Sequence, residues 1–326
     1  MGLFEDLASK IKGTDKRIVF PEAHDERVLK AVVRLKEDGL IIPVLVGNPE
    51  AIQAKAEEVG VSIEGIELHD PENYDAFDDM VTAFVERRKG KATEEQAREI
   101  LKNNMYFSTM LVYQDIAEGI VAGATQSTGD TVRPALQIIK TKPGVALTSG
   151  AMVLESKDGE KLVFADCAIN ISPDAKQLAE IAVETAKTAR MFGVDPKVAM
   201  LSFSTKGSAK SPEVEKMAEA TKLAKELAPD LALDGELQFD AAYVPEVGEF
   251  KAPESTVAGH ANVFIFPDVE AGNIGYKIAQ RLGGYEAVGP ILQSMAKPVS
   301  DLSRGCVEDD VYNLAIITAN QALMED

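Results

Sequence analysis

The segment 299–313 (VSDLSRGCVEDDVYN) holds the densest group of chemically useful side chains in this sequence. Ser303, Arg304 and Cys306 surround a glycine, and three acids, the last of them Asp310, follow at the predicted start of a helix. A hydroxyl, a guanidinium and a carboxylate this close together can bind an anion and accept a proton. Acids in the first turn of a helix also offset the positive end of its dipole in many proteins. The local sequence therefore leaves a catalytic and a capping interpretation open.

A second segment, FSTKGSAKSPE (203–213), follows a predicted strand and precedes a predicted helix. Its candidate ligand groups are the side chains of Thr205, Lys206 and Ser208 around a glycine. Hydroxyls, a lysine and backbone N–H groups at a helix entry form a cradle that suits phosphate. The GxxxxGK[ST] pattern of a P-loop is absent, and a polar surface loop capped by Ser211 explains the same residues. A phosphate site and a surface loop both fit the pattern.

Two arginines lie near predicted helix ends and are candidates for binding an anion. In GATQSTGDTVRPALQII (123–139), Pro134 is predicted to be the first helical residue, which places Arg133 at the N-terminal edge of the helix. A cation there opposes the helix dipole, so we expect an anion held jointly by Arg133 and the helix end. In EAGNIGYKIAQRLGG (270–284), Arg281 lies near the end of an apolar helical stretch, where a cation also complements the dipole. The close-spaced glycines of that stretch allow the backbone to approach either a ligand or another helix.

The charge balance restricts the classes of partner. A net charge of −19 at pH 7 argues against nucleic acid, because neutralising phosphates needs a basic surface. It also makes an anionic membrane surface an unfavourable partner. Only ten arginines occur, and none lies between 191 and 280, so an anionic substrate must be bound by a few local cations. The first residues, MGLFEDLASKIKG, lack an apolar signal core, so the expected location is cytoplasmic.

Metal and covalent chemistry find little support in the sequence. The three histidines, His24, His69 and His260, are scattered, and Cys167 and Cys306 lie far apart, so neither a zinc spacing nor a disulfide framework is present. We therefore expect no metal. No histidine accompanies either cysteine along the chain, which argues against an acyl-cysteine intermediate.

The elements that must position these groups follow from the hydrophobic pattern. Short apolar runs alternate with amphipathic stretches, which predicts mainly parallel sheets with helices on both faces. The expected strands of the first part cover residues 17–20, 41–47 and 62–68, and the expected helices cover about 25–38, 49–59, 72–88 and 93–117.

The rhythm changes near residue 144, where we place a domain boundary. Two strand-like runs joined through Asp158-Gly159 predict an antiparallel hairpin. Ser172-Pro173 predicts the start of a helix, with the serine as N-cap. The remaining expected elements are strands at 198–204 and 261–267, a helix from Pro212 and a terminal helix over 307–324. The terminal helix is expected to return to the first domain, which gives domains of 1–144 plus about 290–326, and 145–289.

Taken together, these segments resemble the phosphate acetyltransferase (phosphotransacetylase) family over essentially the whole chain. The resemblance is carried, in order, by FPEAHDERVLKA, STGDTVRPALQIIKTKPG, FADCAINISPD, LSFSTKGSAKSPE, DGELQFDAA, AGNIGYKIAQRLGGYEAVGPILQ and DLSRGC. It implies a two-domain isocitrate/isopropylmalate-dehydrogenase-like α/β fold with the active site in the interdomain cleft. It implies CoA on the side of the first domain, phosphate on the side of the second, and a homodimer formed through the second domain. The implied reaction is reversible acetyl transfer between CoA and orthophosphate in a ternary complex, with no bound cofactor.

The resemblance also implies roles for single residues. Ser303, Arg304 and Asp310 match the catalytic residues of the family. Arg133 matches a functional arginine that we expect at the CoA phosphates. Either Arg87 or Arg88 matches a further one, because ERRKGK is compressed relative to the more usual ELRKxKG, and we assign Arg87.

The remaining matched arginine, Arg281, is expected to hold phosphoryl oxygens. Lys206, Ser208 and Thr205 would complete the phosphate site.

The implied chemistry has a proton-transfer problem. A thiol such as that of CoA has a reference pKa of about 8.5 and an aspartate one of about 3.9, which makes proton transfer uphill by about 6 kcal/mol. Asp310 is therefore a weak base when it acts alone. We expect Arg304 to stabilise the forming thiolate or the leaving phosphate and Ser303 to bind the sulfur or the carbonyl oxygen.

Three other functions stay open from the sequence. The same transfer on a longer acyl group, as in phosphate butyryltransferases, is close, because one methylene changes binding by only about 1–3 kcal/mol. A non-catalytic acyl-CoA-sensing module and a metal-dependent decarboxylating dehydrogenase share the fold class. The presence of Ser303, Arg304 and Asp310 argues against the first of these two, and the lack of a convincing carboxylate set argues against the second.

Overall fold

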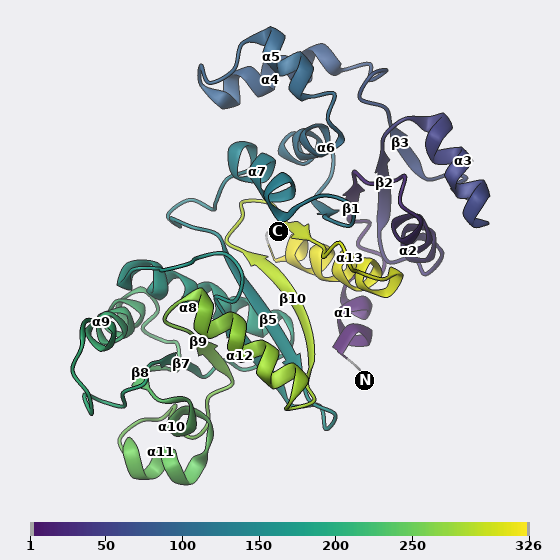
Figure 1. Ribbon diagram of the computed structural model, residues 1–326. Coiled ribbons are helices and arrows are strands. Elements are labelled where there is room, and N and C mark those ends of the chain that lie inside the picture. The colour runs from purple at the N-terminus through teal and green to yellow at the C-terminus, as the bar shows by residue number, and fades with distance from the viewer. Residues whose placement is uncertain (1–2, 325–326) are drawn as a thin grey trace. The chain divides into compact units, whose positions relative to one another are not determined.

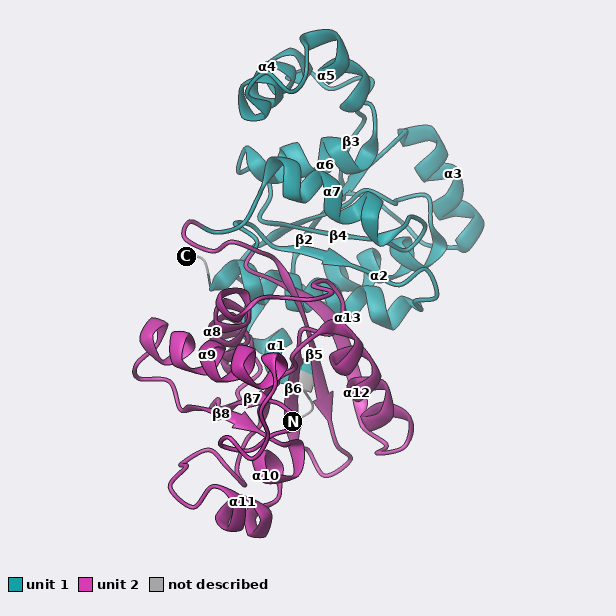
Figure 2. Ribbon diagram, turned by 60° about the vertical axis from the view of Figure 1, so that its left-hand side comes forward, with its two compact units in different colours: residues 1–142, 295–326 teal, residues 143–294 magenta. Residues whose placement is uncertain are grey.

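The computed structural model describes residues 3–324 and divides into two compact units. Unit 1 comprises Met1–Lys142 and Met295–Asp326, and unit 2 comprises Pro143–Ser294. Figure 2 shows them in two colours. Each unit is a β-sheet flanked by helices, so the predicted mixed α/β class with mainly parallel sheets is confirmed.

Unit 1 contains five parallel strands in the order β11-β4-β1-β2-β3 (Figure 1). Its elements are α1 Leu3–Ile11, β1 Arg17–Phe20, α2 Glu26–Glu37, β2 Ile42–Val46, α3 Pro49–Val59, β3 Glu67–His69, α4 Phe77–Arg88, α5 Glu94–Ile100, α6 Asn104–Tyr113, β4 Gly119–Ala122, α7 Thr128–Ile138, β11 Val299–Asp301 and α13 Glu308–Leu323.

The central strands of unit 1 are buried on both faces, as helices covering a parallel sheet require. Every residue of β4 is buried, and α13 packs against α1, α2 and β4. The loops that follow β1, β4 and β11 lie along the carboxyl edge of the sheet, because these three strands are neighbours and parallel. The helices α2, α7 and α13 begin just beyond these loops. That edge is the place where side chains from distant parts of the sequence meet.

Three sequence predictions for unit 1 were inaccurate. The third strand begins only at Glu67, because a turn with Gly65 at φ 68° interrupts the preceding run. The helix expected over 93–117 is two helices, because the side chain of Asn103 accepts hydrogen bonds from the first N–H groups of α6. The expected helix over 72–88 begins only at Phe77.

The position predicted for Arg133 was wrong. Ser127 caps α7 by accepting a hydrogen bond from the N–H of Asp130, so the helix starts six residues before Pro134. Pro134 is therefore inside the helix and Arg133 lies in its second turn, away from the N-terminal edge. The argument that Arg133 opposes the dipole at the helix start no longer applies.

Unit 2 contains a six-stranded mixed sheet in the order β10-β5-β6-β9-β7-β8. Its β5–β6 hairpin is antiparallel, as predicted, while β6, β9, β7 and β8 are parallel. The elements are β5 Ser149–Glu155, β6 Lys161–Ala165, α8 Ala175–Met191, β7 Val198–Leu201, α9 Pro212–Leu227, β8 Leu233–Leu237, α10 Phe239–Tyr243, α11 Pro245–Lys251, β9 Val263–Ile265, α12 Val269–Arg281 and β10 Glu286–Gln293.

Two further expectations in unit 2 are resolved by local contacts. The N-cap of α8 is Asp174 rather than Ser172, because Asp174 and Gln177 form a reciprocal capping box. Gly272 on α12 allows close packing of the helix, since a Cβ there would meet the carbonyl oxygen of Asp166 at 2.2 Å. The glycine therefore serves the approach of one backbone to another.

Glu22 links the loop after β1 to the loop after β4 by hydrogen bonds. Its carboxylate accepts hydrogen bonds from four successive backbone N–H groups of residues 123–126, at 2.7 to 3.1 Å, and from the Thr125 hydroxyl at 2.6 Å. The side chain is 4% exposed. At the start of this loop Gly123 has φ 106°, and a Cβ there would meet Asp301 Oδ1 at 2.5 Å. A buried carboxylate held in this way requires the 123–126 backbone to keep one conformation.

Glu22→Gln is expected to destabilise unit 1 by about 3 kcal/mol, because an amide NH2 would then face N–H donors in a buried site. Urea unfolding followed by circular dichroism measures the change. Glu37→Gln is the matched control: Glu37 is exposed at the end of α2, and its change should stay within about 0.5 kcal/mol. Equal unfolding midpoints for the two variants would contradict the role given to Glu22.

Candidate active site

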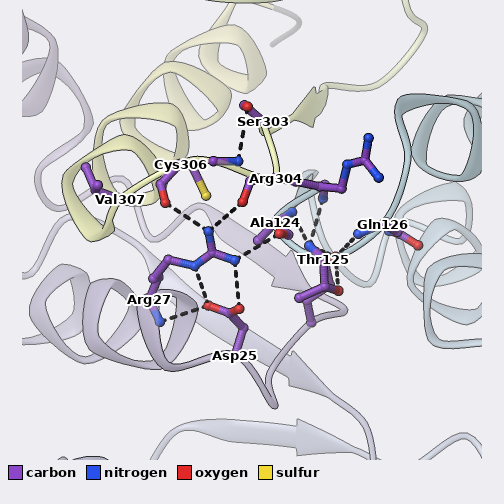
Figure 3. A network of polar contacts seen from close by, with 12 residues as sticks. Asp25, Arg27, Ala124, Thr125, Gln126, Ser303, Arg304, Cys306 and Val307 are labelled. Carbon is purple, nitrogen blue, oxygen red and sulfur yellow. Dashed lines mark hydrogen bonds and ion pairs between the residues drawn. The ribbon is translucent and has the colours of Figure 1, made fainter.

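The 303–306 turn leads from β11 into α13 at the sheet edge described above. The N–H of Gly305 donates to Ser303 Oγ at 3.2 Å, and the N–H of Cys306 donates to the carbonyl oxygen of Ser303 at 2.9 Å. Ser303 and Arg304 are exposed. No hydrogen bond or ion pair joins the Arg304 guanidinium to any residue between 3 and 324, so this cation is available to a ligand (Figure 3).

Asp310 is in the first turn of α13, and its Oδ2 accepts a hydrogen bond from the N–H of Val307 at 2.8 Å. It caps the helix, as one of the two sequence interpretations proposed, and it remains exposed. The neighbouring Asp309 instead pairs with Arg34 at 2.6 Å. Asp310 is thus the acid of this turn that has no cation partner within the part of the chain that the structure describes.

The two cysteines are poor nucleophiles. Cys306 is 5% exposed, and burial raises the pKa of its thiol, although the charge of Arg27 acts in the opposite direction. Burial also raises the pKa of Cys167, and the charge of Asp166 adds to the effect. Both thiols are therefore protonated near neutral pH, which disfavours attack by a thiolate.

A basic pocket of about 650 Å³ lies in unit 1 between the end of α4 and the outer face of α7. Figure 1 shows α4 and α5 as a pair beyond α6 and α7. The positive charge of Arg87 is the first cause of a lowered pKa at Lys140 on the rim. Six cations in one pocket of an acidic chain create a local positive field that suits a ligand with several phosphates. The cationic lining residues are Arg87, Arg88, Lys89, Lys91, Arg133 and Lys140.

Arg87 and Arg133, the two arginines predicted to bind CoA, differ in how firmly their guanidinium groups are already bound by the protein. Arg87 donates to the carbonyl oxygens of Ile138 and Ile139 at 2.5 and 3.0 Å, and its guanidinium lies 4.9 Å from the centre of the Tyr113 ring. Arg87 therefore caps the C-terminal end of α7 and also lines the pocket. Arg133 is exposed and 3.6 Å from Asp130, a looser contact.

The phosphate residues predicted in unit 2 have internal partners. Lys206 Nζ pairs with Asp234 at 2.6 Å and donates to the Gly235 carbonyl oxygen. Burial opposes ionisation of Asp234, but hydrogen bonds from Lys206 and Lys225 outweigh it and lower its pKa to about 2. The lysine is therefore paired with a carboxylate at neutral pH.

The hydroxyls of the same loop are also occupied. Thr205 Oγ1 lies 3.2 Å from Gln238 Oε1, and Ser208 Oγ accepts from the Thr205 N–H at 3.1 Å. Glu236 accepts from the N–H of Gly207 at 2.7 Å. Arg281, exposed at the end of α12, differs: within residues 3–324 its guanidinium has no hydrogen bond or ion pair.

Several residues at the sheet edge escaped the sequence analysis. Glu22, Asp25 and Arg27 belong to FPEAHDERVLKA, which contributed only to the family resemblance. The sequence could have indicated Arg27, because a cation in the first turn of a helix opposes the dipole. The pocket cations were also visible, because RRKGK is a positive run in an acidic chain.

Metal-binding clusters and membrane-spanning helices are both absent from residues 3–324. No group of three or more His, Cys, Asp or Glu side chains could hold a metal ion. None of the helices has the length and apolar character needed to cross a membrane.

Comparison with known proteins places this chain in a family. The sequence model of the phosphate acetyl/butaryl transferase family matches residues 3–319. A phosphate acetyltransferase of Bacillus subtilis is 61% identical over 321 residues, which cover 98% of this chain and 99% of the relative. One of Staphylococcus epidermidis is 58% identical over 326 residues, with coverage of 98% and 99%.

A solved structure agrees with the sequence relatives. A phosphotransacetylase from Streptococcus pyogenes superposes with a TM-score of 0.97 at 57% identity, covering 99% of this chain and 98% of that one. The resemblance inferred from the motifs is therefore confirmed: the chain belongs to the phosphate acetyl/butaryl transferase family of enzymes.

Proposed function

We propose that this protein is a phosphate acetyltransferase, which moves an acetyl group reversibly between coenzyme A and orthophosphate. The observation that carries the proposal is the 303–310 segment, where the free guanidinium of Arg304 stands with the Ser303 hydroxyl and the Asp310 carboxylate at the carboxyl edge of a parallel sheet. The chain's membership of the family adds support, as does its match to nearly the full length of a phosphate acetyltransferase.

The proposed reaction is direct attack in a ternary complex. The CoA sulfur attacks the carbonyl carbon of acetyl phosphate, Asp310 takes the thiol proton, and the bond from that carbon to the bridging oxygen breaks to release phosphate. Arg304 stabilises the negative charge that develops on the sulfur or the leaving phosphate, and Ser303 donates to the sulfur or the carbonyl oxygen. The raised thiol pKa of Cys306 supports a route without an acyl-cysteine.

Coenzyme A is a substrate in this proposal, and its phosphates are assigned to the basic pocket with Arg133 and Arg87. The pocket volume and its six cations support a polyanionic ligand there. In unit 2 the phosphoryl oxygens are assigned to Arg281, whose guanidinium has no hydrogen bond or ion pair to give up within residues 3–324. Lys206, Ser208 and Thr205 belong to the same set only if each exchanges an internal hydrogen bond for one to phosphate.

The activity is tested by following acetyl-CoA formation from CoA and acetyl phosphate without added metal. Asp310→Asn is expected to lower kcat by about 10² to 10⁴-fold with little change in either KM, because the amide cannot accept the thiol proton. Asp309→Asn is the matched control, since that acid is adjacent and bonded to Arg34, and its kcat should stay within about twofold.

Full activity of Asp310→Asn would remove the base from the mechanism, and an inactive wild type would refute the proposed function. Assaying butyryl-CoA with phosphate in parallel separates the acetyl from the longer-chain reaction. Exchange of acetyl phosphate with phosphate in the absence of CoA would contradict direct transfer.

Arg133→Ala is expected to raise the KM for CoA by about 10 to 100-fold, because a charge-assisted hydrogen bond contributes about 1.5–3 kcal/mol. The KM for acetyl phosphate should change little. Arg98→Ala controls for removal of a surface arginine, since Arg98 is paired with Asp78 and Glu94 and does not line the pocket. An unchanged KM for CoA in Arg133→Ala would refute the assignment of the pocket.

The proposed assembly is a homodimer formed through unit 2. Support comes from an exposed apolar stripe on and just after α12, where Ile274, Ile278 and Leu282 recur every four residues and are 58%, 52% and 85% exposed. Ile278→Glu is expected to shift the mass in sedimentation equilibrium from about two chains to one. Leu227→Glu, at a position on α9 that is 58% exposed, should leave the mass unchanged, and a single-chain mass for the wild type would contradict the dimer.

A further inference from the structure

Arg27 uses all five of its guanidinium N–H donors on the protein itself (Figure 3). Nε and one Nη2 hydrogen donate to the two carboxylate oxygens of Asp25 at 3.0 and 2.8 Å. The second Nη2 hydrogen donates to the Ala124 carbonyl oxygen, and Nη1 donates to the carbonyl oxygens of Arg304 and Cys306, each at 2.9 Å. With every donor engaged, Arg27 has none left for a substrate.

The position of Arg27 is unfavourable for the helix that carries it. It lies in the first turn of α2, where a cation opposes the dipole at a cost of about 0.3–1 kcal/mol. Asp25, the N-cap, offsets that cost by accepting from Arg27 with both oxygens as well as from the N–H of the same residue. The hydrogen bond to Asp25 also raises the pKa of Arg27, so the guanidinium stays charged. Helix stability therefore gives no reason for an arginine at this position.

The three carbonyl groups that Arg27 binds lie in two different loops. Ala124 is in the loop whose N–H groups hold Glu22, so its position is already determined. Arg304 and Cys306 lie on either side of Gly305, and one nitrogen of Arg27 binds both carbonyls. These bonds define the backbone of the turn while the Ser303 and Arg304 side chains stay exposed.

A lysine cannot reproduce this arrangement. Its ammonium offers three donors around one point, whereas the guanidinium reaches Asp25, Ala124 and the turn from a rigid planar fork. The requirement is therefore for geometry and not only for positive charge.

We propose that Arg27, oriented by Asp25, is a positioning residue for acetyl transfer: it fixes the 303–306 turn so that Ser303 and Arg304 meet the reacting groups in the transition state. This inference rests on the function proposed above. Arg27 acts through the turn and does not touch substrate.

The kinetic test is Arg27→Lys in the full chain. We expect kcat to fall about 10 to 100-fold while the KM values for CoA and acetyl phosphate change by less than about threefold, because misplacement of the turn weakens only transition-state contacts. The matched control is Arg34→Lys, also on α2. Arg34 bonds to Asp309 and stacks on Tyr312 in α13 without contacting the turn, so its kcat should stay within about twofold.

Combining Arg27→Lys with changes in the turn separates positioning from a general loss of structure. If Arg27 acts through the turn, adding Arg27→Lys to the double variant Ser303→Ala/Arg304→Ala should lower kcat by less than about threefold beyond that double variant alone. Additive losses, a changed KM with an unchanged kcat, or a wild-type kcat for Arg27→Lys would each overturn the proposal. Asp25→Asn, which keeps Arg27 but loosens its orientation, should show the same pattern with a smaller loss, and it replaces Arg27→Lys if that variant does not fold.

A measurement without turnover keeps this inference distinct from the proposed function. Cys306 is the last residue of the turn and only 5% exposed, so releasing the turn should raise its labelling rate by a thiol reagent at least tenfold. Peptide mass spectrometry separates its label from that of Cys167. An inactive wild type would refute the proposed function alone, whereas equal labelling of Cys306 in wild type and Arg27→Lys would refute the positioning role whatever the activity.

Discussion

The buried carboxylate of Glu22 is the interaction on which the arrangement of the sheet edge in unit 1 depends. Its charge is tolerated away from water only because five N–H and O–H donors surround it. Four of those donors are successive backbone groups, so satisfying the carboxylate determines the path of residues 123–126. The Ala124 carbonyl then has a defined position, Arg27 binds it, and the same guanidinium binds the 303–306 turn. Three loops that are far apart in sequence thereby hold one another.

The net negative charge and the basic pocket affect an anionic ligand over different distances. A charge of −19 repels anionic substrates at long range, but salt screens such effects beyond about 8–10 Å. Within the pocket six cations lie close to any bound phosphate, and its lining residues include no Asp or Glu. The acidic surface therefore restricts non-specific binding of polyanions, while the pocket restores attraction where it is needed.

Elements with a strong local pattern could be predicted from the sequence, and contacts between distant segments could not. The bounds of α3 and the start of α9 were predicted correctly, because Asn48 and Ser211 are side-chain caps followed by a proline. Pro134 misled the prediction for α7, since a proline inside a helix resembles one at its start.

The candidate site divides in the same way. The resemblance supplied Ser303, Arg304 and Asp310, which are near one another in sequence. The bonds from Glu22 to residues 123–126 and from Arg27 to the 303–306 turn span about 100 and 280 positions, so no local pattern contains them.

The proposed acetyl transfer gives a reason for the turn to be fixed while its side chains stay free. Proton transfer from a thiol to an aspartate is uphill by about 6 kcal/mol on reference pKa values, so Asp310 needs charge stabilisation nearby when the thiol is attacking. A cation already bound to a carboxylate would offer little, because its field is neutralised in the ground state. Arg304 avoids this: its backbone carbonyl is held by Arg27, and its guanidinium has no partner within residues 3–324. Because the turn is ordered during folding, the guanidinium would meet the developing charge of the proposed reaction without reorganisation.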